Sequence, residues 1–251
     1  MSTATAHPSR HIELERAFNF RDLGGYPTAG GGTTLWHRLY RADGIHRISE
    51  ADVVRLEPLG LRTVIDLRTP DELEQHGRVP IDDVDYHHHP VMDVVWSIDV
   101  LESQADSPTF LVDRYVEMLV TGEEALGRSL RLLAEQDTYP AVFHCAAGKD
   151  RTGIVAALVL ALLQVPDDVI AEDYALSREG VARMIEWVKV NMPEARERMS
   201  KAPSAMMSSE PESILALLDH IRAEHQSIER YVATLGVDAA HIAGLRASLV
   251  G

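Results

Sequence analysis

The stretch that decides the fold is AVFHCAAGKDRTGIVAALVLALL, residues 141–163. Its first residues are β-branched and aromatic, which favours a strand, and its last residues are continuously apolar, which favours a buried helix. Between them lies a turn of small residues, Ala146, Ala147 and Gly148. Cys145, the only cysteine among 251 residues, stands where the strand ends. The order of strand, small turn and helix therefore places a thiol beside a helix N-terminus.

The turn has the composition of an anion-binding loop. Its small residues let successive backbone N–H groups point inward, and the helix adds the positive end of its dipole. Arg151 adds a guanidinium fork that matches phosphate geometry. A helix N-terminus stabilises a thiolate, and Thr152 could donate its hydroxyl to it, so Cys145 is predicted to attack phosphorus. The alternative is that Cys145 is a small buried hydrophobe, but the pattern His-Cys-x-x-Gly-x-x-Arg-Thr-Gly favours the nucleophile.

Strand and helix signals alternate on both sides of this stretch. Capping patterns at Ser49 and at Thr69-Pro70 predict helices that end at Gly60 and Gly77. Strands are expected over 35–42, 61–67, 84–91 and 139–145, and helices from Ser107-Pro108 to about 120, over 123–136, after Gly148, and through most of the chain from Pro166. The sequence predicts an α/β fold, with a mostly parallel sheet flanked by helices and a helical C-terminal third. The chain is expected to form one domain over residues 12–251, after a flexible N-terminus over residues 1–11.

Charge and composition narrow the function classes. With 24 basic and 39 acidic residues, the net charge of −15 argues against binding nucleic acid or an anionic membrane through the overall field. The longest apolar run, Ile154–Leu163, is too short to span a bilayer. A single cysteine suits a reducing compartment, and the N-terminus lacks the apolar segment of a Sec signal. A cytoplasmic location is therefore expected, with non-Sec export left open.

Four stretches of the sequence carry a resemblance to a known family. They are NFRDLGGY (19–26), LYRAD (39–43), VIDLRTPDE (64–72) and HCAAGKDRTG (144–153). The last resembles the Cys-x5-Arg phosphate loop of the cysteine-dependent protein tyrosine phosphatase superfamily. The four in this order resemble, more narrowly, a bacterial tyrosine-phosphatase-like family that includes secreted tyrosine and phosphoinositide phosphatases of intracellular pathogens. The resemblance covers roughly residues 12–250 and implies the protein-tyrosine-phosphatase-like fold and hydrolysis of phosphomonoesters through a phosphocysteine.

The resemblance also implies roles for residues of the loop. Cys145 would be the nucleophile and Arg151 the clamp on the transition state. The backbone amides from Ala146 to Arg151 would hold the phosphate, and His144 and Thr152 would tune the thiolate. No metal or other cofactor is expected, and inorganic phosphate would be the product.

The general acid is less defined by the sequence. No Trp-Pro-Asp motif occurs, and the upstream aspartates have no distinguishing context: Asp93, Asp99, Asp106 and Asp113. Asp150, inside the loop, is the first choice and Asp93 the second, because the resembled family carries an aspartate at the loop position. The alternative for Asp150 is an ion pair with Lys149 or an arginine. Lys149 is either an exposed lysine at a helix start or a second positive charge for a multiply phosphorylated substrate.

Residues outside the loop yield further expectations. Asp66 is expected to brace the loop or Arg151 from behind, or to cap a strand end. In YHHHP (86–90) only two histidines share a strand face, so a metal site is not favoured. Met184 and Trp187 are expected to face the core. Met206 and Met207 suggest a mobile flap, and the resemblance implies a helical lid from residues 177–212.

Three function classes follow, and the complete loop favours the first. It is a phosphatase of protein tyrosine phosphatase type, with dual-specificity or phosphoinositide activity as a further option. The others are a non-catalytic phosphate-binding module and a rhodanese-like sulfurtransferase. The substrate stays open among phosphotyrosine, phosphoserine or phosphothreonine in proteins, phosphoinositides and small phosphate esters.

Overall fold

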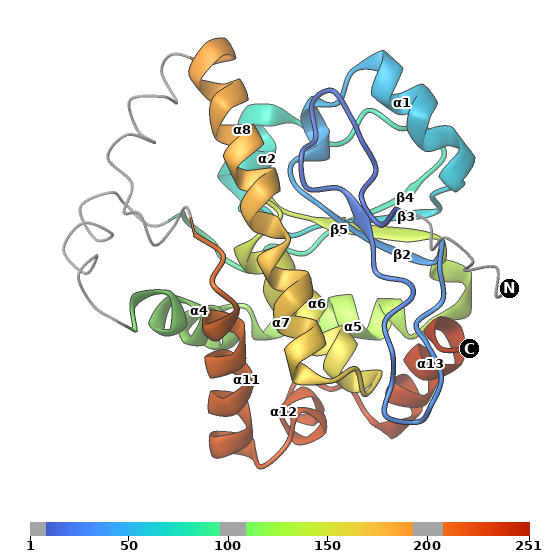
Figure 1. The fold of residues 1–251 in the computed structure, drawn as a ribbon, viewed down its shortest axis with the longest axis vertical. Coiled ribbons are helices and arrows are strands. Elements are labelled where there is room, and N and C mark those ends of the chain that lie inside the picture. Colours follow the sequence, from blue (N-terminus) through green and yellow to red (C-terminus); the bar gives the residue numbers. More distant parts are fainter. Residues whose placement is uncertain (1–8, 96–108, 193–207) are drawn as a thin grey trace, which may run out of the picture.

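A five-stranded sheet forms the centre of the protein (Figure 1). The structure, a computed structural model, describes residues 9–95, 109–192 and 208–251. The spatial order of the sheet is β1-β2-β5-β3-β4. The strands are β1 (Arg21–Asp22), β2 (Leu39–Ala42), β3 (Thr63–Asp66), β4 (Asp85–His88) and β5 (Ala141–His144). Only the edge strand β1 runs antiparallel to its neighbour. The predicted, mostly parallel sheet is confirmed, and Cys145 follows its middle strand.

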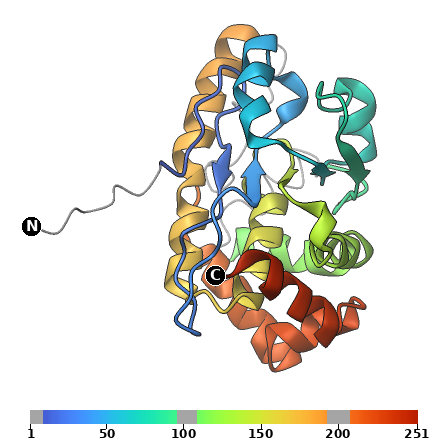
Figure 2. The same ribbon diagram turned by 90° about the vertical axis from the view of Figure 1, so that its right-hand side faces the viewer.

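Helices cover both faces of the sheet. In Figure 1, α1 (Glu50–Leu56) and α2 (Pro70–His76) lie above it. Below it lie α4 (Phe110–Thr121), α5 (Glu123–Leu133), α6 (Asp150–Leu162), α7 (Asp167–Ala175), α11 (Pro211–His225), α12 (Ile228–Thr234) and α13 (Ala239–Leu249). The long helix α8 (Ser177–Asn191) runs along one side of the molecule past both layers, as both views show (Figure 2).

Side chains alternate across the sheet and divide the core in two. On β5, Phe143 packs into the larger apolar cluster with the lower helices, whereas Val142 packs into the smaller cluster on the side of α1. On β3, Ile65 and Val64 divide in the same way. Because successive residues of a strand point to opposite faces, both layers of helices bury apolar surface on one sheet.

The apolar run after the loop forms the buried helix α6. Every residue from Arg151 to Leu160 is buried, because α6 contacts β2, β5 and six neighbouring helices. A helix that is apolar all round is expected in such surroundings. Within the described parts of the chain, no helix has the length and apolar character needed to cross a membrane.

Local capping signals match the structure closely. Ser49 and Thr69 each form a capping box, and Gly60 and Gly77, both with positive φ, follow the helical segments that begin there. Other boundaries differ. The strand expected from residue 35 begins only at Leu39, because His37 has φ 62° and donates its backbone N–H to Asp22. Helix α5 ends at Leu133 rather than 136, and Ser107 and Pro108 lie outside the described residues.

The chain is already held before residue 12. Arg10 donates to the carbonyl oxygens of Asp22 and Gly24, and its guanidinium lies 3.8 Å from the centre of the Tyr26 ring. His11 forms a β-bridge with Arg21. These two residues therefore belong to the folded body, whereas the sequence placed them in a flexible terminus.

The acid stability of the fold should depend on buried histidines. Burial and nearby positive charges lower the pKa of His89 to about 4, although His89 retains a contact with Ser129 at 3.0 Å. In the unfolded chain this pKa is about 6.5. The unfolded state therefore binds more protons below about pH 6.5, so the stabilisation present above that pH is lost as pH falls toward 4.

We expect the free energy of unfolding to decline between about pH 6.5 and 4.5, by at most about 1.4 kcal/mol per pH unit for His89. Urea denaturation at a series of pH values measures it. His89→Gln, whose amide can still contact Ser129, should flatten the decline. An unfolding free energy that is independent of pH over this range in the wild type would contradict the expectation.

Candidate active site

Cys145 lies at the start of a short loop between β5 and α6, and it is 1% exposed. The loop turns at Gly148, which has φ 66°. A Cβ atom at this position would lie 2.6 Å from the backbone nitrogen of Asp43 and 2.7 Å from the carbonyl carbon of Ala42. Only glycine satisfies both the backbone conformation and the close approach to the end of β2. The end of the predicted LYRAD stretch thus supports the loop directly.

Three successive loop carbonyls, those of residues 146–148, accept hydrogen bonds from outside the loop. The amide of Gly44 donates to the first at 3.0 Å. The side-chain amide of Asn19 donates to the second and third at 3.2 and 3.0 Å, and Arg41 donates to the third at 2.8 Å. In a trans peptide the N–H points opposite to the C=O, so the following amides point to the inside of the loop. The described residues offer no acceptor to the first two of these N–H groups, those of residues 147 and 148. This arrangement suits an anion.

Arg151 is held by Glu72, a partner that the sequence did not reveal. Its two terminal nitrogens lie 2.5 and 3.1 Å from the two carboxylate oxygens. Burial alone would raise the pKa of Glu72, but the charge of Arg151 and its hydrogen bonds hold this pKa below the usual value. Glu72 also accepts from the amide of Thr69 as part of the capping box of α2. The signal in the sequence was the capping box, because it fixes Glu72 in the first turn of the helix that follows β3. In the structure, β3 pairs with β5, the strand that leads into the loop.

His144 and Asp66 lie behind the loop and are fully buried. The Nε2 atom of His144 is 3.6 Å from a carboxylate oxygen of Asp66, and Nδ1 is 3.4 Å from the carbonyl oxygen of Cys145. Burial lowers the pKa of His144 despite the nearby carboxylate. Asp66 binds the guanidinium of Arg68 at 2.6 Å and accepts the Tyr86 hydroxyl at 2.7 Å. The hydrogen bonds of Asp66 therefore go to Arg68 and Tyr86 and not to Arg151, and Nε2 of His144 has no hydrogen-bond partner among the described residues.

A cavity of about 690 Å³ opens above the loop. Its apolar lining comes from α8 and its C-terminal end, with Met184, Trp187, Val188 and Met192. The rest of the lining consists of the polar side chains of His46, Arg47, Arg68, Glu72, Gln75 and His76, and of Ala146 and Ala147 from the loop. The expectation that Met184 and Trp187 face the core is wrong, because both are half-buried and line this cavity. Of the proposed flap, Met206 and Met207 lie outside the described residues, as does the part of the lid region between 193 and 207.

Residues 12–251 match the sequence model of the tyrosine phosphatase family. The chain belongs to this family. It is 31% identical over 252 residues to a Cupriavidus necator protein named as a candidate tyrosine-protein phosphatase, with 96% of this chain and 90% of that protein covered. It is 29% identical over 282 residues to the triple specificity protein phosphatase PtpB of Mycobacterium tuberculosis, with 95% and 99% covered. A tyrosine-protein phosphatase of Nostoc commune is 34% identical over 139 residues, which are 55% of this chain and 47% of that protein.

Family membership makes the chain a phosphatase enzyme that acts on phosphorylated substrates. The predicted fold class and the resemblance are thereby confirmed. The rhodanese-like sulfurtransferase and the non-catalytic binding module are not favoured by these relatives.

In this tyrosine phosphatase, Asp150 begins α6 and is tied to two neighbours. One carboxylate oxygen accepts the Tyr115 hydroxyl at 2.7 Å and lies 3.3 Å from the ammonium group of Lys149. Lys149 is 1% exposed and donates to the carbonyl oxygen of Ser208 at 2.8 Å. Lys149 is therefore a buried loop residue, which rules out the exposed helix-start lysine. Thr152 has a buried hydroxyl without a hydrogen-bond partner among the described residues.

The upstream aspartates lie elsewhere. Asp93 is exposed after β4, and Asp113 is exposed on α4, where it accepts the Thr109 hydroxyl. Neither lines the cavity above the phosphatase loop. Asp99 and Asp106 lie outside the described residues.

The histidines of YHHHP have separate partners. His87 contacts Asp85, His88 contacts the carbonyl oxygen of Arg68, and His89 contacts Ser129. Among the described residues, no three histidine, cysteine or acidic side chains converge as metal ligands would.

Proposed function

We propose that this phosphatase hydrolyses phosphomonoesters in two steps with Cys145 as the nucleophile. The thiolate attacks phosphorus, the bond from phosphorus to the leaving oxygen breaks, and a phosphocysteine forms. Water then attacks this intermediate, which releases inorganic phosphate and regenerates the thiolate. The observation that supports the proposal most is the outward orientation of the carbonyls of residues 146–148 around a buried thiol, with Arg151 fixed at the same opening.

The roles of the surrounding groups follow from this geometry. The inward amides and Arg151 bind the equatorial oxygens of the phosphoryl group and stabilise the charge that builds up there. Glu72 keeps the guanidinium oriented before substrate arrives. The hydroxyl of Thr152, which has no hydrogen-bond partner among the described residues, is available as a donor to the thiolate, and His144 contacts the carbonyl oxygen of Cys145.

We propose Asp150 as the general acid that protonates the leaving oxygen and then accepts a proton from water. Its carboxylate starts from the first helical residue next to Arg151 and keeps partial contact with solvent. Tyr115 and Lys149 limit its rotation. Asp93 is the alternative, but it lies in the exposed segment after β4, whereas Asp150 is the neighbour of Arg151 at the start of α6.

Asp150→Asn should slow esters with poor leaving groups more than esters with good ones. General acid catalysis contributes roughly 10² to 10⁴ in rate, mainly when the leaving oxygen needs a proton. We expect a loss of about 10²-fold in kcat for alkyl phosphates and phosphotyrosine, and about tenfold or less for p-nitrophenyl phosphate. The measurement is a comparison of kcat across phosphate esters of graded leaving-group pKa.

Asp93→Asn is the matched variant for this measurement. It should leave the dependence of kcat on the leaving group as in the wild type. Equal losses for all esters in Asp150→Asn, together with a steeper dependence in Asp93→Asn, would transfer the role to Asp93.

For the substrate, we propose phosphotyrosine in proteins first, with phosphoserine, phosphothreonine and phosphoinositides as further substrates. The apolar side of the cavity, with Trp187 and Met184, suits an aromatic ring. Arg47, whose guanidinium lies 6.0 Å from the centre of the Trp187 ring, and His76 line the same cavity and suit a second anionic group. The triple specificity named for the mycobacterial relative supports this breadth.

A substrate panel tests the proposal. We expect hydrolysis of p-nitrophenyl phosphate in excess EDTA, and the highest kcat/KM for phosphotyrosine peptides among phosphopeptides. Measurable kcat/KM on phosphatidylinositol monophosphates would support the second anionic site. Trp187→Ala should lower kcat/KM for phosphotyrosine by about tenfold, since an aromatic contact contributes about 0.5–1.5 kcal/mol beyond its buried area. A preference for phosphoserine peptides that Trp187→Ala leaves unchanged would contradict the proposed order.

A further inference from the structure

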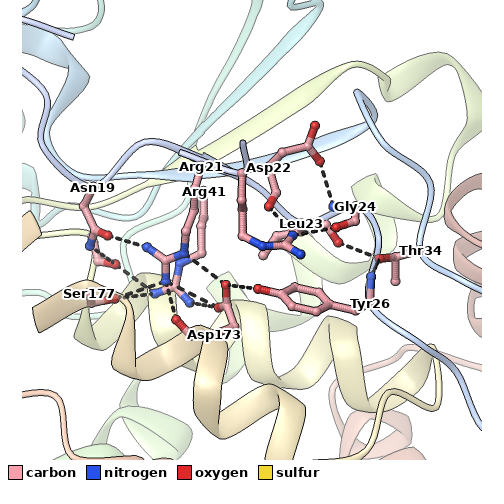
Figure 3. A network of polar contacts seen from close by, with 12 residues as sticks. Asn19, Arg21, Asp22, Leu23, Gly24, Tyr26, Thr34, Arg41, Asp173 and Ser177 are labelled. Atoms are coloured by element: carbon pink, nitrogen blue, oxygen red, sulfur yellow. Dashed lines mark hydrogen bonds and ion pairs between the residues drawn. The ribbon is translucent and has the colours of Figure 1, made fainter. Parts of the chain in front are cut away.

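Two buried arginines share a single carboxylate behind the phosphate loop (Figure 3). Arg21 on β1 lies 3.0 Å from one oxygen of Asp173 on α7, and Arg41 on β2 lies 2.6 Å from the other. All three side chains are at most 3% exposed. Tyr26 reaches the same carboxylate from the opposite side and donates its hydroxyl at 2.8 Å. Asn19 belongs to the same network, because its side-chain oxygen accepts a hydrogen bond from Arg21.

Two branches lead from Asp173 to the same atom of the loop. In the first, Arg41 binds Asp173 with one terminal nitrogen and donates to the carbonyl oxygen of Gly148 with the other, at 2.8 Å. In the second, Arg21 donates to the side-chain oxygen of Asn19, and the amide nitrogen of Asn19 donates to Gly148 at 3.0 Å. The same nitrogen lies 3.2 Å from the carbonyl oxygen of Ala147.

The carboxylate of Asp173 compensates the positive charges of the two buried guanidinium groups. Two guanidinium groups buried side by side repel each other, and an uncompensated buried charge is strongly unfavourable. Burial and the nearby Arg21 lower the pKa of Arg41 to about 10, and Asp173 opposes this shift. Burial would raise the pKa of Asp173, but the two arginines hold it far below its usual value, so this residue stays ionised. The two planar groups are thereby oriented toward the loop.

We propose that Asp173 is a positioning residue of the phosphatase, a role that rests on the proposed function of the loop. Through Arg41, and through Arg21 with Asn19, it holds the carbonyls of Ala147 and Gly148 away from the anion. Because N–H and C=O point in opposite directions in a trans peptide, this aims the amides of Gly148 and Lys149 at the phosphoryl group. The side chain of Asp173 itself does not touch the substrate.

Asp173→Asn is the direct test, with Tyr26→Phe as the control. Asparagine keeps the shape but cannot compensate two cations. We expect the inhibition constant of inorganic phosphate to rise about tenfold or more, and kcat/KM to fall by a similar factor. The loss should be equal for p-nitrophenyl phosphate and phosphotyrosine, because the loop binds the phosphoryl group and not the leaving group. Tyr26→Phe removes a hydrogen bond to the same carboxylate without reaching the loop, so it should lower the melting temperature and leave the phosphate inhibition constant within about twofold.

A second experiment covers the case in which Asp173→Asn does not fold. Arg41→Lys keeps a positive charge beside Asp173 but cannot span both partners, and Asn19→Ala removes the other donor to Gly148. Both donors act on one carbonyl, so the effects of the two substitutions should not be independent. We expect the factor by which the double variant loses phosphate affinity to differ by about threefold or more from the product of the two single-variant factors.

These outcomes separate the two proposals. The positioning role would be overturned by an Asp173→Asn protein that is folded and less stable but unchanged in phosphate affinity. It would also be overturned if the loss of phosphate affinity in the double variant equalled the product of the losses in Arg41→Lys and Asn19→Ala. Failure of the wild type to form a phosphocysteine would instead overturn the proposed function of the loop.

Discussion

Cys145→Ser is expected to lower kcat by at least about 10³-fold, because a serine hydroxyl at the same position is not ionised and is a poor nucleophile. Binding of inorganic phosphate should stay within a few-fold of the wild type. In the proposed mechanism the donors to the anion are the backbone amides and Arg151, and the substitution removes neither of them. Turnover of p-nitrophenyl phosphate and calorimetric titration with phosphate measure the two quantities separately.

Alkylation provides an independent control for this prediction. Cys145 is the only cysteine of the chain, so iodoacetate can modify only one thiol per molecule. We expect modification to abolish turnover in proportion to its extent, and inorganic phosphate to slow it. Residual activity of Cys145→Ser above about one per cent would count against a phosphocysteine route.

Arg151→Lys is expected to reduce both the rate and the affinity for phosphate, with a loss in kcat/KM of about 10²- to 10³-fold. A lysine provides one charge but not the fork that binds two oxygens, and it cannot keep both contacts with Glu72. The loss should therefore appear in kcat as well as in the inhibition constant of phosphate, unlike the pattern expected for Cys145→Ser.

Glu72→Gln is the matched variant for the Arg151 prediction. It keeps the size of the side chain and a hydrogen-bond acceptor, but removes the charge that orients the guanidinium. We expect a smaller loss, of about tenfold in kcat/KM, because Arg151 stays in place with more freedom. An Arg151→Lys enzyme within about tenfold of the wild type would contradict the role of the guanidinium fork.

Local patterns in the sequence predicted much of this fold because local interactions set these features. The capping boxes at Ser49 and Thr69 depend on contacts three residues apart, and the structure has both. The loop after Cys145 depends on small residues and on a glycine with positive φ, which the motif also specifies. The mostly parallel sheet followed from the alternation of strands and helices.

Contacts between distant segments could not be derived in this way. Glu72 and Arg151 are 79 residues apart, and Arg21 and Asp173 are 152 apart, so no local period reports either pair. The resemblance marked NFRDLGGY without a physical reason, whereas the structure shows Asn19 and Arg21 supporting the loop. Hydrophobic periodicity also does not distinguish a cavity wall from a core, which is why Met184 and Trp187 were assigned to the wrong surroundings.

Direct detection of the phosphoenzyme tests the central claim most sharply. The enzyme is mixed with excess p-nitrophenyl phosphate, quenched in acid during turnover and digested, and its peptides are analysed by mass spectrometry. The account predicts one phosphoryl group on the peptide that contains Cys145, lost on treatment that cleaves phosphorus–sulfur bonds, and absent in Cys145→Ser. Rapid turnover with no phosphorylated Cys145 peptide, or with the phosphoryl group on another residue, would contradict it.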